Sequence, residues 1–465
     1  MREEQPGFIT RLKSALCLAP GTPLVFLGNF EVETRWGRDM IGLPVFSRAA
    51  AGAMVNRMDE FALLLAGPDD LVVLKEPPDP GYLAQLSELG LRLPRVLVPE
   101  QTDPARTVTE DALHAPALVE ELSRLAGSGA ALLPHGVSEA EEALAVASGL
   151  PLAAPPAAVC EAVNSKVYSR RLTERLDLRR PRGWACDSLA DWSTALGHAR
   201  ELLGEGRTIG VKDAFGVSGK GIVQVEDERR LNALDRMVTT RARRAGTERI
   251  GLVVEEWVAK SADLNYQFTL GRDASLHFDF VKEAVTERGV HKGHRIPARL
   301  DAEQHAELVS TARLLGRQLS DDGYFGVVGV DAMVDPDGGL YPVVEINARN
   351  NMSTYQLPLQ EEFVAAGRSA LARHYTLHLG GELDFATVRH ALGERLFSRG
   401  SGSGLLVNNF ATVNAARATR EEGGTTEGRL YGLVVGEDFD AVSRIDAEVE
   451  RELASYATHS EGARP

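Results

Sequence analysis

Two carboxylates and an amide form the sharpest pattern of chemically capable residues in this sequence. Residues 325–347 read as an apolar strand, a turn rich in Asp, Pro and Gly, and an apolar returning strand. If the hairpin is centred near Asp337, then Asp331, Glu345 and Asn347 share one face, because side chains alternate along a strand. Asp331 and Glu345 are then diagonal neighbours at a Cα spacing of about 7–8 Å. Such oxygen donors suit Mg²⁺ that carries phosphates. The alternative is a hairpin with two unrelated acids.

Two arginines are candidates for contacts with reacting groups. Arg349 follows Asn347 by two residues, where it can stabilise charge on a phosphoryl group or a tetrahedral intermediate. Alone it would more simply pair with a surface acid, but beside a metal-binding hairpin the catalytic interpretation is favoured. Arg295 lies in the basic segment 291–297 of an acidic chain and is a candidate to bind a substrate carboxylate. A solvated loop is the alternative there.

A glycine-rich loop follows the predicted strand that ends near Lys212. It contains Gly219, Lys220 and Gly221 and returns directly into a second strand. Glycines allow backbone N–H groups to approach phosphate oxygens closely, and the lysines add positive charge. The loop is not a Walker A motif, because GxxxxGK[ST] is absent and a strand follows instead of a helix. The alternative is an ordinary glycine-rich hairpin with a solvated lysine.

A second apolar strand, from residue 251, runs directly into two acids and an aromatic residue. They are Glu255, Glu256 and Trp257, followed by Val258. The backbone here can hydrogen-bond the edge of an adenine while Trp257 and Val258 wall the ring, as in apolar pockets with a few placed polar groups. The alternative is a buried strand that ends in solvated acids.

Composition and charge limit the classes of protein to which this chain can belong. The chain has 465 residues, of which 44% are hydrophobic and 25% charged, which is typical of a globular protein of about three domains. Its net charge of −15 argues against binding to a nucleic-acid backbone. Cys17, Cys160 and Cys186 lie far apart, which excludes a disulfide framework and a Cys-based zinc site. No signal peptide and no apolar run of about 18 residues is visible, so we expect a soluble cytoplasmic protein without membrane contact.

The remaining patterns predict an α/β protein with some α+β elements. Before residue 150, helical patterns alternate with short apolar runs, which favours a parallel sheet. The Pro- and Ala-rich segment 150–156 marks a boundary, and one helix is expected from about Ala158 to Leu176. A flexible Gly/Ser tract at 398–404 is either an interdomain linker or a mobile loop. Further expected elements are strands at 23–28, 71–74, 95–98, 405–410 and 430–435 and a closing helix at about 439–456.

Taken in order, these motifs resemble the ATP-grasp superfamily of carboxylate–amine ligases over roughly residues 158–376. The resemblance implies an ATP-grasp fold with an N-terminal parallel α/β pre-grasp domain and a small C-terminal α/β domain. It implies ATP and two Mg²⁺ ions as cofactors, Lys166 as the first phosphate contact and Asp263 as the ribose contact. The implied domains are 1–157, 158–378 and 379–465, with a lid at about 158–260 and a metal-binding half at about 261–378.

The flanking regions are similar to the pheganomycin-type peptide ligases, notably residues 27–32 and the segment 430–433. Members of that family join an unusual guanidino-bearing amino acid, through its carboxylate, to the N-terminus of a peptide. The resemblance therefore implies an acyl phosphate intermediate, release of ADP and phosphate, a short peptide acceptor, a role in antibiotic biosynthesis and a homodimer as one expected assembly. D-alanine ligases place an arginine where Gly329 stands here, which counts against a D-Ala–D-Ala substrate.

Other functions remain open at this stage. One is another ADP-forming acid–amine ligase, an acid–thiol ligase or a small-molecule kinase. A further one is a non-catalytic ATP-binding regulatory module, which the complete Asp331–Glu345–Asn347–Arg349 set disfavours. ATP turnover that requires both an acid and an amine would distinguish the ligase from each of these.

Overall fold

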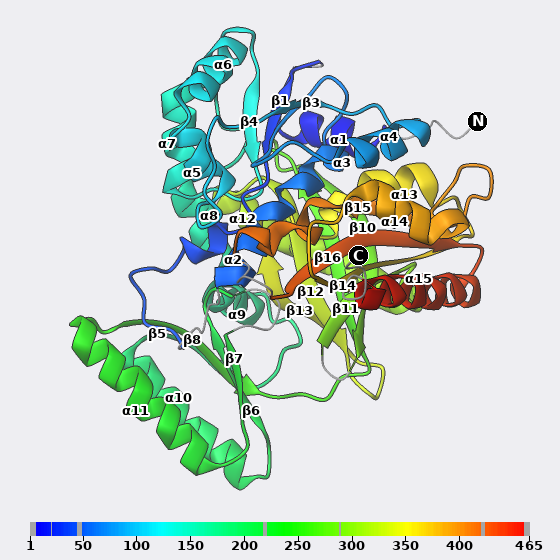
Figure 1. Ribbon diagram of the computed structural model, residues 1–465. Coiled ribbons are helices and arrows are strands. Elements are labelled where there is room, and N and C mark those ends of the chain that lie inside the picture. The colour runs from blue at the N-terminus through cyan, green and yellow to red at the C-terminus, as the bar shows by residue number, and fades with distance from the viewer. Residues whose placement is uncertain are drawn as a thin grey trace.

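The computed structural model describes residues 6–19, 21–43, 49–216, 221–287, 290–419 and 424–459. Figure 1 shows an N-terminal α/β layer at the top, a large central sheet and a lid of two long helices on a small sheet at the lower left. Gly219 and Lys220 of the expected phosphate loop lie outside the described residues. No helix in the described part of the chain is long and apolar enough to cross a membrane.

The N-terminal layer is a four-stranded parallel sheet, as the sequence predicts. Its strand order is β3-β2-β1-β4, and the order reverses between β1 and β4. Loops that follow the carboxyl ends of such strands diverge and leave a crevice, which is where open α/β sheets bind ligands. The strands are β1 Leu24–Leu27, β2 Leu71–Val73, β3 Arg95–Leu97 and β4 Ala131–Pro134; the helices are α1 Phe8–Ala15, α2 Ala49–Asn56, α3 Ala62–Leu65, α4 Pro80–Glu88, α5 Val108–Leu113, α6 Pro116–Gly127 and α7 Glu139–Ser148.

The single helix expected from Ala158 to Leu176 is wrong, because the structure has two helices there. α8 (Ala157–Asn164) ends where Ser165 adopts an extended backbone, with φ −71° and ψ 136°. The Ser165 side chain accepts a hydrogen bond from the Val167 N–H and so caps α9 (Lys166–Arg175). The break places Lys166 at the first position of α9, with its N–H bonded to the carbonyl of Ala214 at 2.9 Å.

The lid is an antiparallel sheet covered on one face by two helices. Its order is β5-β8-β6-β7, and the β6–β7 hairpin is the one expected around Lys212. Buried apolar residues of α10 and α11 pack on Ile209, Val211 and Val254, so the neighbouring residues of the strands face the opposite side. The elements are β5 Gly183–Ser188, α10 Leu189–Gly204, β6 Ile209–Asp213, β7 Ile222–Val225, α11 Glu228–Ala245 and β8 Arg249–Glu256.

An eight-stranded sheet forms the centre of the molecule, in the order β13-β12-β9-β10-β11-β14-β16-β15. Its elements are β9 Ala262–Leu270, β10 Leu276–Glu287, β11 Val290–Ile296, α12 Ala302–Asp321, β12 Gly326–Val334, β13 Leu340–Asn347, α13 Leu357–Phe363, β14 Ser369–Leu379, α14 Phe385–Leu392, β15 Gly404–Asn409, β16 Thr426–Gly436 and α15 Phe439–His459. The described 3₁₀ turns are η1 Val32–Thr34, η2 Arg57–Phe61, η3 Thr354–Gln356, η4 Gly393–Arg395, η5 Ala411–Val413 and η6 Ala415–Thr419.

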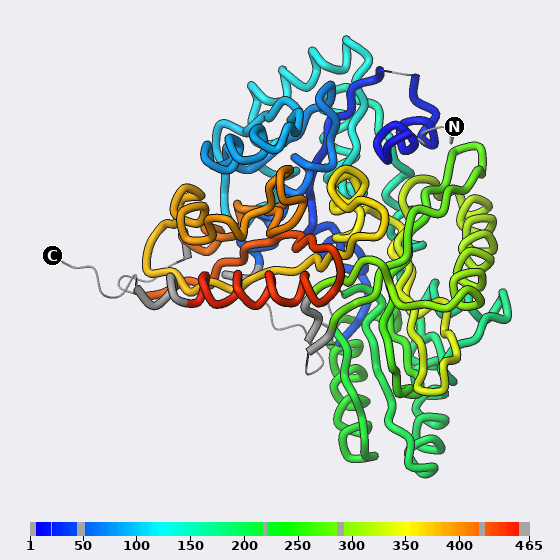
Figure 2. The backbone as a smooth tube through the Cα atoms, turned by 90° about the vertical axis from the view of Figure 1, so that its right-hand side faces the viewer, coloured from blue at the N-terminus to red at the C-terminus, as the bar shows by residue number. Residues whose placement is uncertain are grey.

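The C-terminal strands continue this central sheet. β16 pairs with β14 along its whole length, and Figure 2 shows α15 lying along the C-terminal strands. A boundary near residue 379 therefore does not separate two sheets. The Gly/Ser tract is a hydrogen-bonded turn: the Gly402 N–H donates to Ser398 at 2.8 Å, and Arg399 Nε donates to the Leu89 carbonyl at 2.6 Å. The domain boundaries drawn from the sequence stay predictions.

Truncation after Gly400 is expected to abolish cooperative folding. It removes β15, β16 and α15, leaves β14 without one neighbour and uncovers a core that also contains Tyr82 and Leu86 of the pre-grasp layer. Thermal unfolding and size-exclusion chromatography measure this, with a control that lacks only residues 460–465. A truncated chain that unfolds cooperatively at the temperature of the control would show that the C-terminal segment is an independent unit.

Candidate active site

The β12–β13 hairpin places Asp331 directly opposite Glu345. The register near the turn is the expected one, but a bulge adds two residues to β13 between the Met333 and Asp331 pairs, so the diagonal placement predicted from sequence is wrong. Pro342 lies in the bulged stretch and has no N–H to donate to the ladder. Because the insertion is even, Asp331 and Glu345 keep a common face, and Asn347 joins them opposite Gly329.

Lys166 neutralises one of these acids. Its Nζ donates to Glu345 Oε1 at 2.6 Å and to the Gly216 carbonyl at 3.0 Å, so it connects β13 to the lid. The side chain is 7% exposed. Burial alone would lower the pKa of Lys166, but the carboxylates of Glu345, Glu33 and Asp331 raise it overall. This ammonium is therefore a fixed positive charge at neutral pH.

Asp331 lies on β12, between β13 and β9 in the sheet. Burial and, to a smaller extent, the Glu345 carboxylate raise its pKa to about 6, although the hydrogen bond from Asn265 and the charges of Arg349 and Lys166 oppose this shift. The Asn265 amide donates to Asp331 Oδ1 at 2.8 Å from the adjacent strand β9. A pKa near 6 leaves Asp331 mostly ionised at pH 7, as a metal ligand requires.

Arg349 completes the cluster from the loop after β13. Its Nε and Nη2 both donate to Glu33 Oε1, the first at 2.7 Å, and Nη2 also donates to Asn347 Oδ1 at 3.0 Å. A side chain at Gly329 would require Asn351 to shift, because a Cβ built there lies 2.2 Å from the Asn351 side-chain nitrogen.

The lid contributes a second lysine. Lys212 Nζ lies 2.5 Å from Glu255 Oε1, and both side chains lie on the lid face opposite α10 and α11. Gly221, with φ +80°, accepts the Asp213 N–H at 2.8 Å at the end of the glycine-rich loop. Glu256 points to the other face, where Arg182 pairs with it at 3.0 Å.

The hinge after β8 borders a cavity of about 450 Å³. Trp257 and Val258 line it together with Thr208 and the hairpin turn 335–337, and the Trp257 ring is 37% exposed. Asp263 pairs with Met333 across β9 and β12, on the face that carries Asp331 and Asn265. Its carboxylate is 2.5 Å from Lys260 Nζ.

Arg295, a predicted substrate contact, lies away from the cluster. On β11 it pairs with Glu283, which pairs with Leu264, so its side chain lies on the face opposite Asp331. Its guanidinium stacks on the Phe439 ring, with 3.3 Å from Cζ to the ring centroid. The register therefore does not support contact between Arg295 and a substrate at this site.

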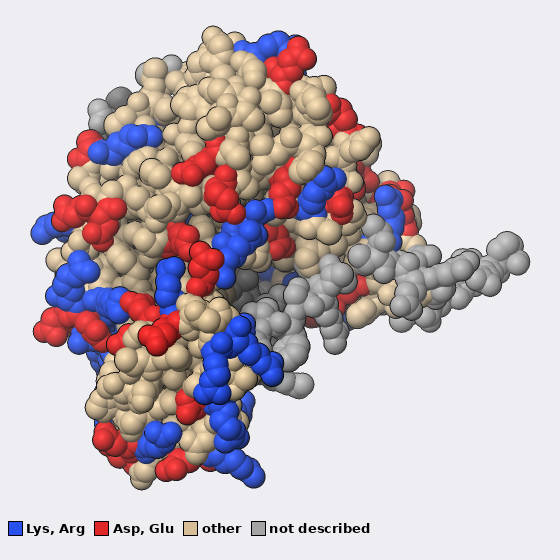
Figure 3. Space-filling model, turned by 90° about the vertical axis from the view of Figure 1, so that its left-hand side faces the viewer, with Lys and Arg blue, Asp and Glu red and all other residues tan. Residues whose placement is uncertain are grey.

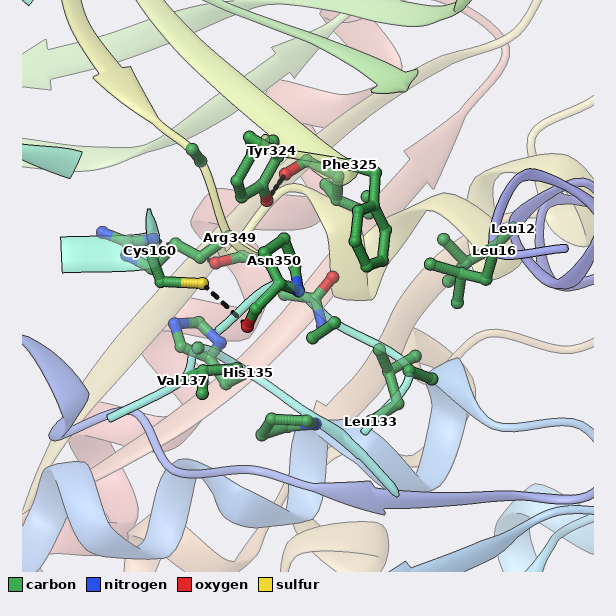
Figure 4. Close-up of a pocket in the computed structure, with 18 residues that line it drawn as sticks. Leu12, Leu16, Leu133, His135, Val137, Cys160, Tyr324, Phe325, Arg349 and Asn350 are labelled. Carbon is green, nitrogen blue, oxygen red and sulfur yellow. Dashed lines mark hydrogen bonds between the residues drawn. The ribbon is translucent and has the colours of Figure 1, made fainter. Parts of the chain in front are cut away.

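Two residues that hold the cluster together were not predicted. Asn265 had a sequence signal, because Asp263, Asn265, Gln267 and Thr269 alternate with apolar residues along β9. Glu33 had none, since it lies 316 positions from Arg349. Figure 4 shows Arg349 and Asn350 beside His135 and Cys160, where the pre-grasp layer meets the sheet. The cavity there is about 30 Å³, enough for a water molecule and too small for a substrate.

The acids and amides of the cluster fit Mg²⁺. Among the described residues, no three His, Cys, Asp or Glu side chains gather closely enough to hold a metal ion by themselves. Asp331, Glu345 and the oxygen of Asn347 supply two carboxylates and one amide on a single face. A few protein oxygens, completed by phosphates and water, are the usual ligand set of Mg²⁺ in nucleotide sites.

Lys282 lies on the same face in the next strand, without a carboxylate partner among the described residues. It is fully buried, donates to the Ser353 carbonyl and Gln356 Oε1 at 3.0 Å each, and burial lowers its pKa to about 7. Because the unfolded chain binds this proton up to its ordinary pKa, the free energy of unfolding should rise as the pH rises from 7 to 10, by on the order of 4 kcal/mol.

Lys282→Met should remove this pH dependence. Denaturant unfolding of the wild-type protein and the variant at several pH values between 7 and 10 measures this dependence. In the difference between their free energies of unfolding, the contributions of the other titrating groups cancel. Parallel profiles would contradict the prediction.

Comparison with known proteins agrees with this geometry. A family model described as the Pre ATP-grasp domain matches residues 58–150. The [butirosin acyl-carrier protein]–L-glutamate ligase of Niallia circulans is 27% identical over 348 residues, which cover 73% of this chain and 75% of that protein. The ADP complex of N5-carboxyaminoimidazole ribonucleotide synthetase has a TM-score of 0.54 at 11% identity, over 95% of this chain and 99% of the other. The chain is thus similar to ATP-grasp ligases in part of its sequence and in its fold.

A second solved structure extends the agreement in fold. The biotin carboxylase domain of 2-oxoglutarate carboxylase from Hydrogenobacter thermophilus, in complex with Mg-ADP and bicarbonate, has a TM-score of 0.52 at 14% identity, over 92% of this chain and 89% of that one. The ATP-grasp fold and the class of ligase expected from the sequence are confirmed. The roles of individual residues stay proposals.

Proposed function

We propose that this ATP-grasp ligase activates the carboxylate of an amino acid as an acyl phosphate and joins it to the N-terminal amine of a peptide. The observation that carries this proposal is the Asp331–Glu345 pair, held in one buried cluster with Lys166 and Arg349. The finer expectation of a guanidino-bearing amino acid rests on the similarity to pheganomycin-type ligases.

Three residues would hold Mg²⁺: Asp331, Glu345 and Asn347. A bound Mg²⁺ would offset the negative charge of the ATP phosphates. Lys166 and Lys212 would bind phosphate oxygens, together with backbone N–H groups of the loop that contains Gly219, Lys220 and Gly221. Their present carboxylate partners hold both ammonium groups at the site.

The hinge would hold the base and the sugar. We assign the adenine edge to the backbone of Glu255 to Val258, with the Trp257 ring as a wall, and the ribose to Asp263. The side chain of Glu256 takes no part in this, because it pairs with Arg182 on the other face of the lid.

The chemistry follows from this arrangement. A carboxylate oxygen of the amino acid attacks the γ-phosphorus, and the bond to the β-phosphate oxygen breaks, which releases ADP. The peptide amine then attacks the acyl carbon, loses a proton and displaces inorganic phosphate. Arg349 would stabilise the negative charge in both steps. Positioning and electrostatics supply most of the rate enhancement in such transfers.

The products test the proposal. Incubation with ATP, a guanidino- or aryl-glycine-like acid and a short peptide should yield ADP, stoichiometric phosphate and an N-acylated peptide, resolved by chromatography and mass spectrometry. Hydroxylamine should intercept the acyl phosphate as a hydroxamate. AMP and pyrophosphate would overturn the mechanism, and ADP with a stable phosphorylated acid would favour a kinase.

A carrier-protein acceptor is the second candidate. The relative from Niallia circulans is named for one, and α11 offers a surface for an acidic partner. Figure 3 shows Lys and Arg side chains gathered on the lid, in a chain of net charge −15. Five exposed arginines of α11 pair with no described carboxylate: Arg229, Arg230, Arg236, Arg243 and Arg244.

Charge reversal separates this candidate from the peptide ligase. Replacing Arg236, Arg243 and Arg244 by Glu should raise the KM for a carrier protein and leave the KM for a short peptide and for ATP unchanged. If the wild-type enzyme and the triple variant turn over carrier proteins equally well, α11 is not the docking surface.

A further inference from the structure

Glu33 reaches the active site from a different layer of the molecule. It lies in η1, directly after β1 of the pre-grasp sheet, whereas its partner Arg349 follows β13 of the central sheet. The pair is largely buried: the Glu33 side chain is 12% exposed and that of Arg349 is 9% exposed. Burial alone would lower the pKa of Arg349, but Glu33 raises it overall. Each charge therefore depends on the other for its solvation.

The two loops that carry this pair are fixed to each other. Asn29, at the end of β1, accepts the His135 N–H and donates to the Gly136 carbonyl, each at 2.8 Å. The Asn350 N–H donates to the His135 carbonyl at 3.1 Å. The loops after β1 and β4 thus form one rigid wall at the point where the strand order reverses, and Glu33 projects from it.

Among the described residues, Arg349 has one other side-chain acceptor, Asn347, which also has a second proposed role. Its guanidinium donates to Glu33, to the Asn347 side chain and, through Nη1, to the Asn350 carbonyl at 2.9 Å. Asn347 Oδ1 is also an oxygen that we assign to Mg²⁺. Glu33 is therefore the charged acceptor of Arg349 that we do not assign to the metal.

We infer that Glu33 is a positioning residue, an inference that rests on the proposed function. Glu33 holds the Arg349 guanidinium over the reacting groups while Asn347 binds the metal. Through it the pre-grasp layer becomes part of the catalytic site. Glu33 acts on Arg349 and not on the substrate. Its removal should therefore lower kcat more than it weakens binding of ATP or of the acid.

Glu33→Gln tests this inference, because it keeps the shape and removes the charge. We expect kcat to fall by about 30- to 100-fold, with the Kd of ATP and the KM of the acid changed less than about threefold. The matched control is Glu110→Gln, which breaks another Arg–carboxylate pair of the same layer, with Arg35, and should leave kcat unchanged. A raised KM for the acid at constant kcat would make Glu33 a substrate ligand and overturn the inference. Kinetic constants equal to those of the wild-type enzyme would overturn it as well.

A ligand-free measurement keeps this result separate from the proposed function. In a double-mutant cycle of Glu33→Gln and Arg349→Met, the two changes should be coupled by at least about tenfold in the unfolding equilibrium constant. Additive effects would overturn the contact itself. If the wild-type protein forms no ADP with any acid and amine, the proposed function fails, while a coupled cycle still supports the Glu33–Arg349 contact.

Discussion

Glu345→Gln should lower kcat/KM by about 10³-fold while the protein stays folded. The amide keeps the volume of the side chain, and its oxygen can still accept the hydrogen bond from Lys166, which the wild-type carboxylate accepts at 2.6 Å. What is lost is one of the two negative charges that face each other across β12 and β13. Asp331 alone then has to attract the metal. The expected result is loss of Mg²⁺-dependent ADP formation with an unchanged thermal unfolding curve.

The measurement is ADP release at saturating ATP and acceptor, with Mg²⁺ titrated over several orders of magnitude. Glu303→Gln is the matched control, because this exposed acid lies in the first turn of α12 and its side chain makes no described hydrogen bond or ion pair. Full activity of Glu345→Gln at low Mg²⁺ would remove the metal assignment. A partial recovery at high Mg²⁺ would support it, since a weakened site can be refilled by mass action.

The part of this site that the sequence predicts is the part encoded locally. The hairpin is local because its turn chemistry and its alternation lie within about twenty residues, and its acids therefore appear on one face as expected. The bulge at Pro342 is also local, yet the pattern of alternation does not reveal it, since a shift by two residues leaves every side chain on its face. The same pattern gave no warning that Arg295 falls on the opposite face, because that depends on pairing three strands away.

Long-range contacts account for what sequence reasoning missed. Glu33 and Arg349 meet only because the pre-grasp sheet packs its β1 and β4 loops on the end of β13. The Gly/Ser tract has the composition of a linker, but Arg399 fastens it to the carbonyl of Leu89 in another layer. The break at Ser165 is an exception, because it has a local sequence signal. Serine is a preferred helix N-cap, so the serine directly before Lys166 indicates the start of a new helix.

Arg349→Met should lower kcat by about 10²- to 10³-fold with only a small change in ATP affinity. The guanidinium makes contacts to Glu33, Asn347 and Asn350 that hold it beside the two acids. Arg349→Lys should be nearly as inactive, because an ammonium cannot form the planar fork that binds Glu33 and Asn347 together. Glu33 is left buried without its partner, so both variants must be assayed well below their unfolding temperature. Arg373→Met is the control: it breaks a buried pair with Asp446 on the face of the sheet that α15 covers.

The two proposed tasks of Arg349 can be separated by trapping. If it stabilises the transferring phosphoryl group, Arg349→Met should lose hydroxamate formation in the presence of hydroxylamine as severely as it loses amide formation. If it acts only on the tetrahedral intermediate, hydroxamate and ADP should still form while the amide product disappears. We expect the first result, because Arg349 lies close enough to Asp331 and Glu345 for both carboxylates to raise its pKa. Normal rates of both products would exclude Arg349 from the chemistry.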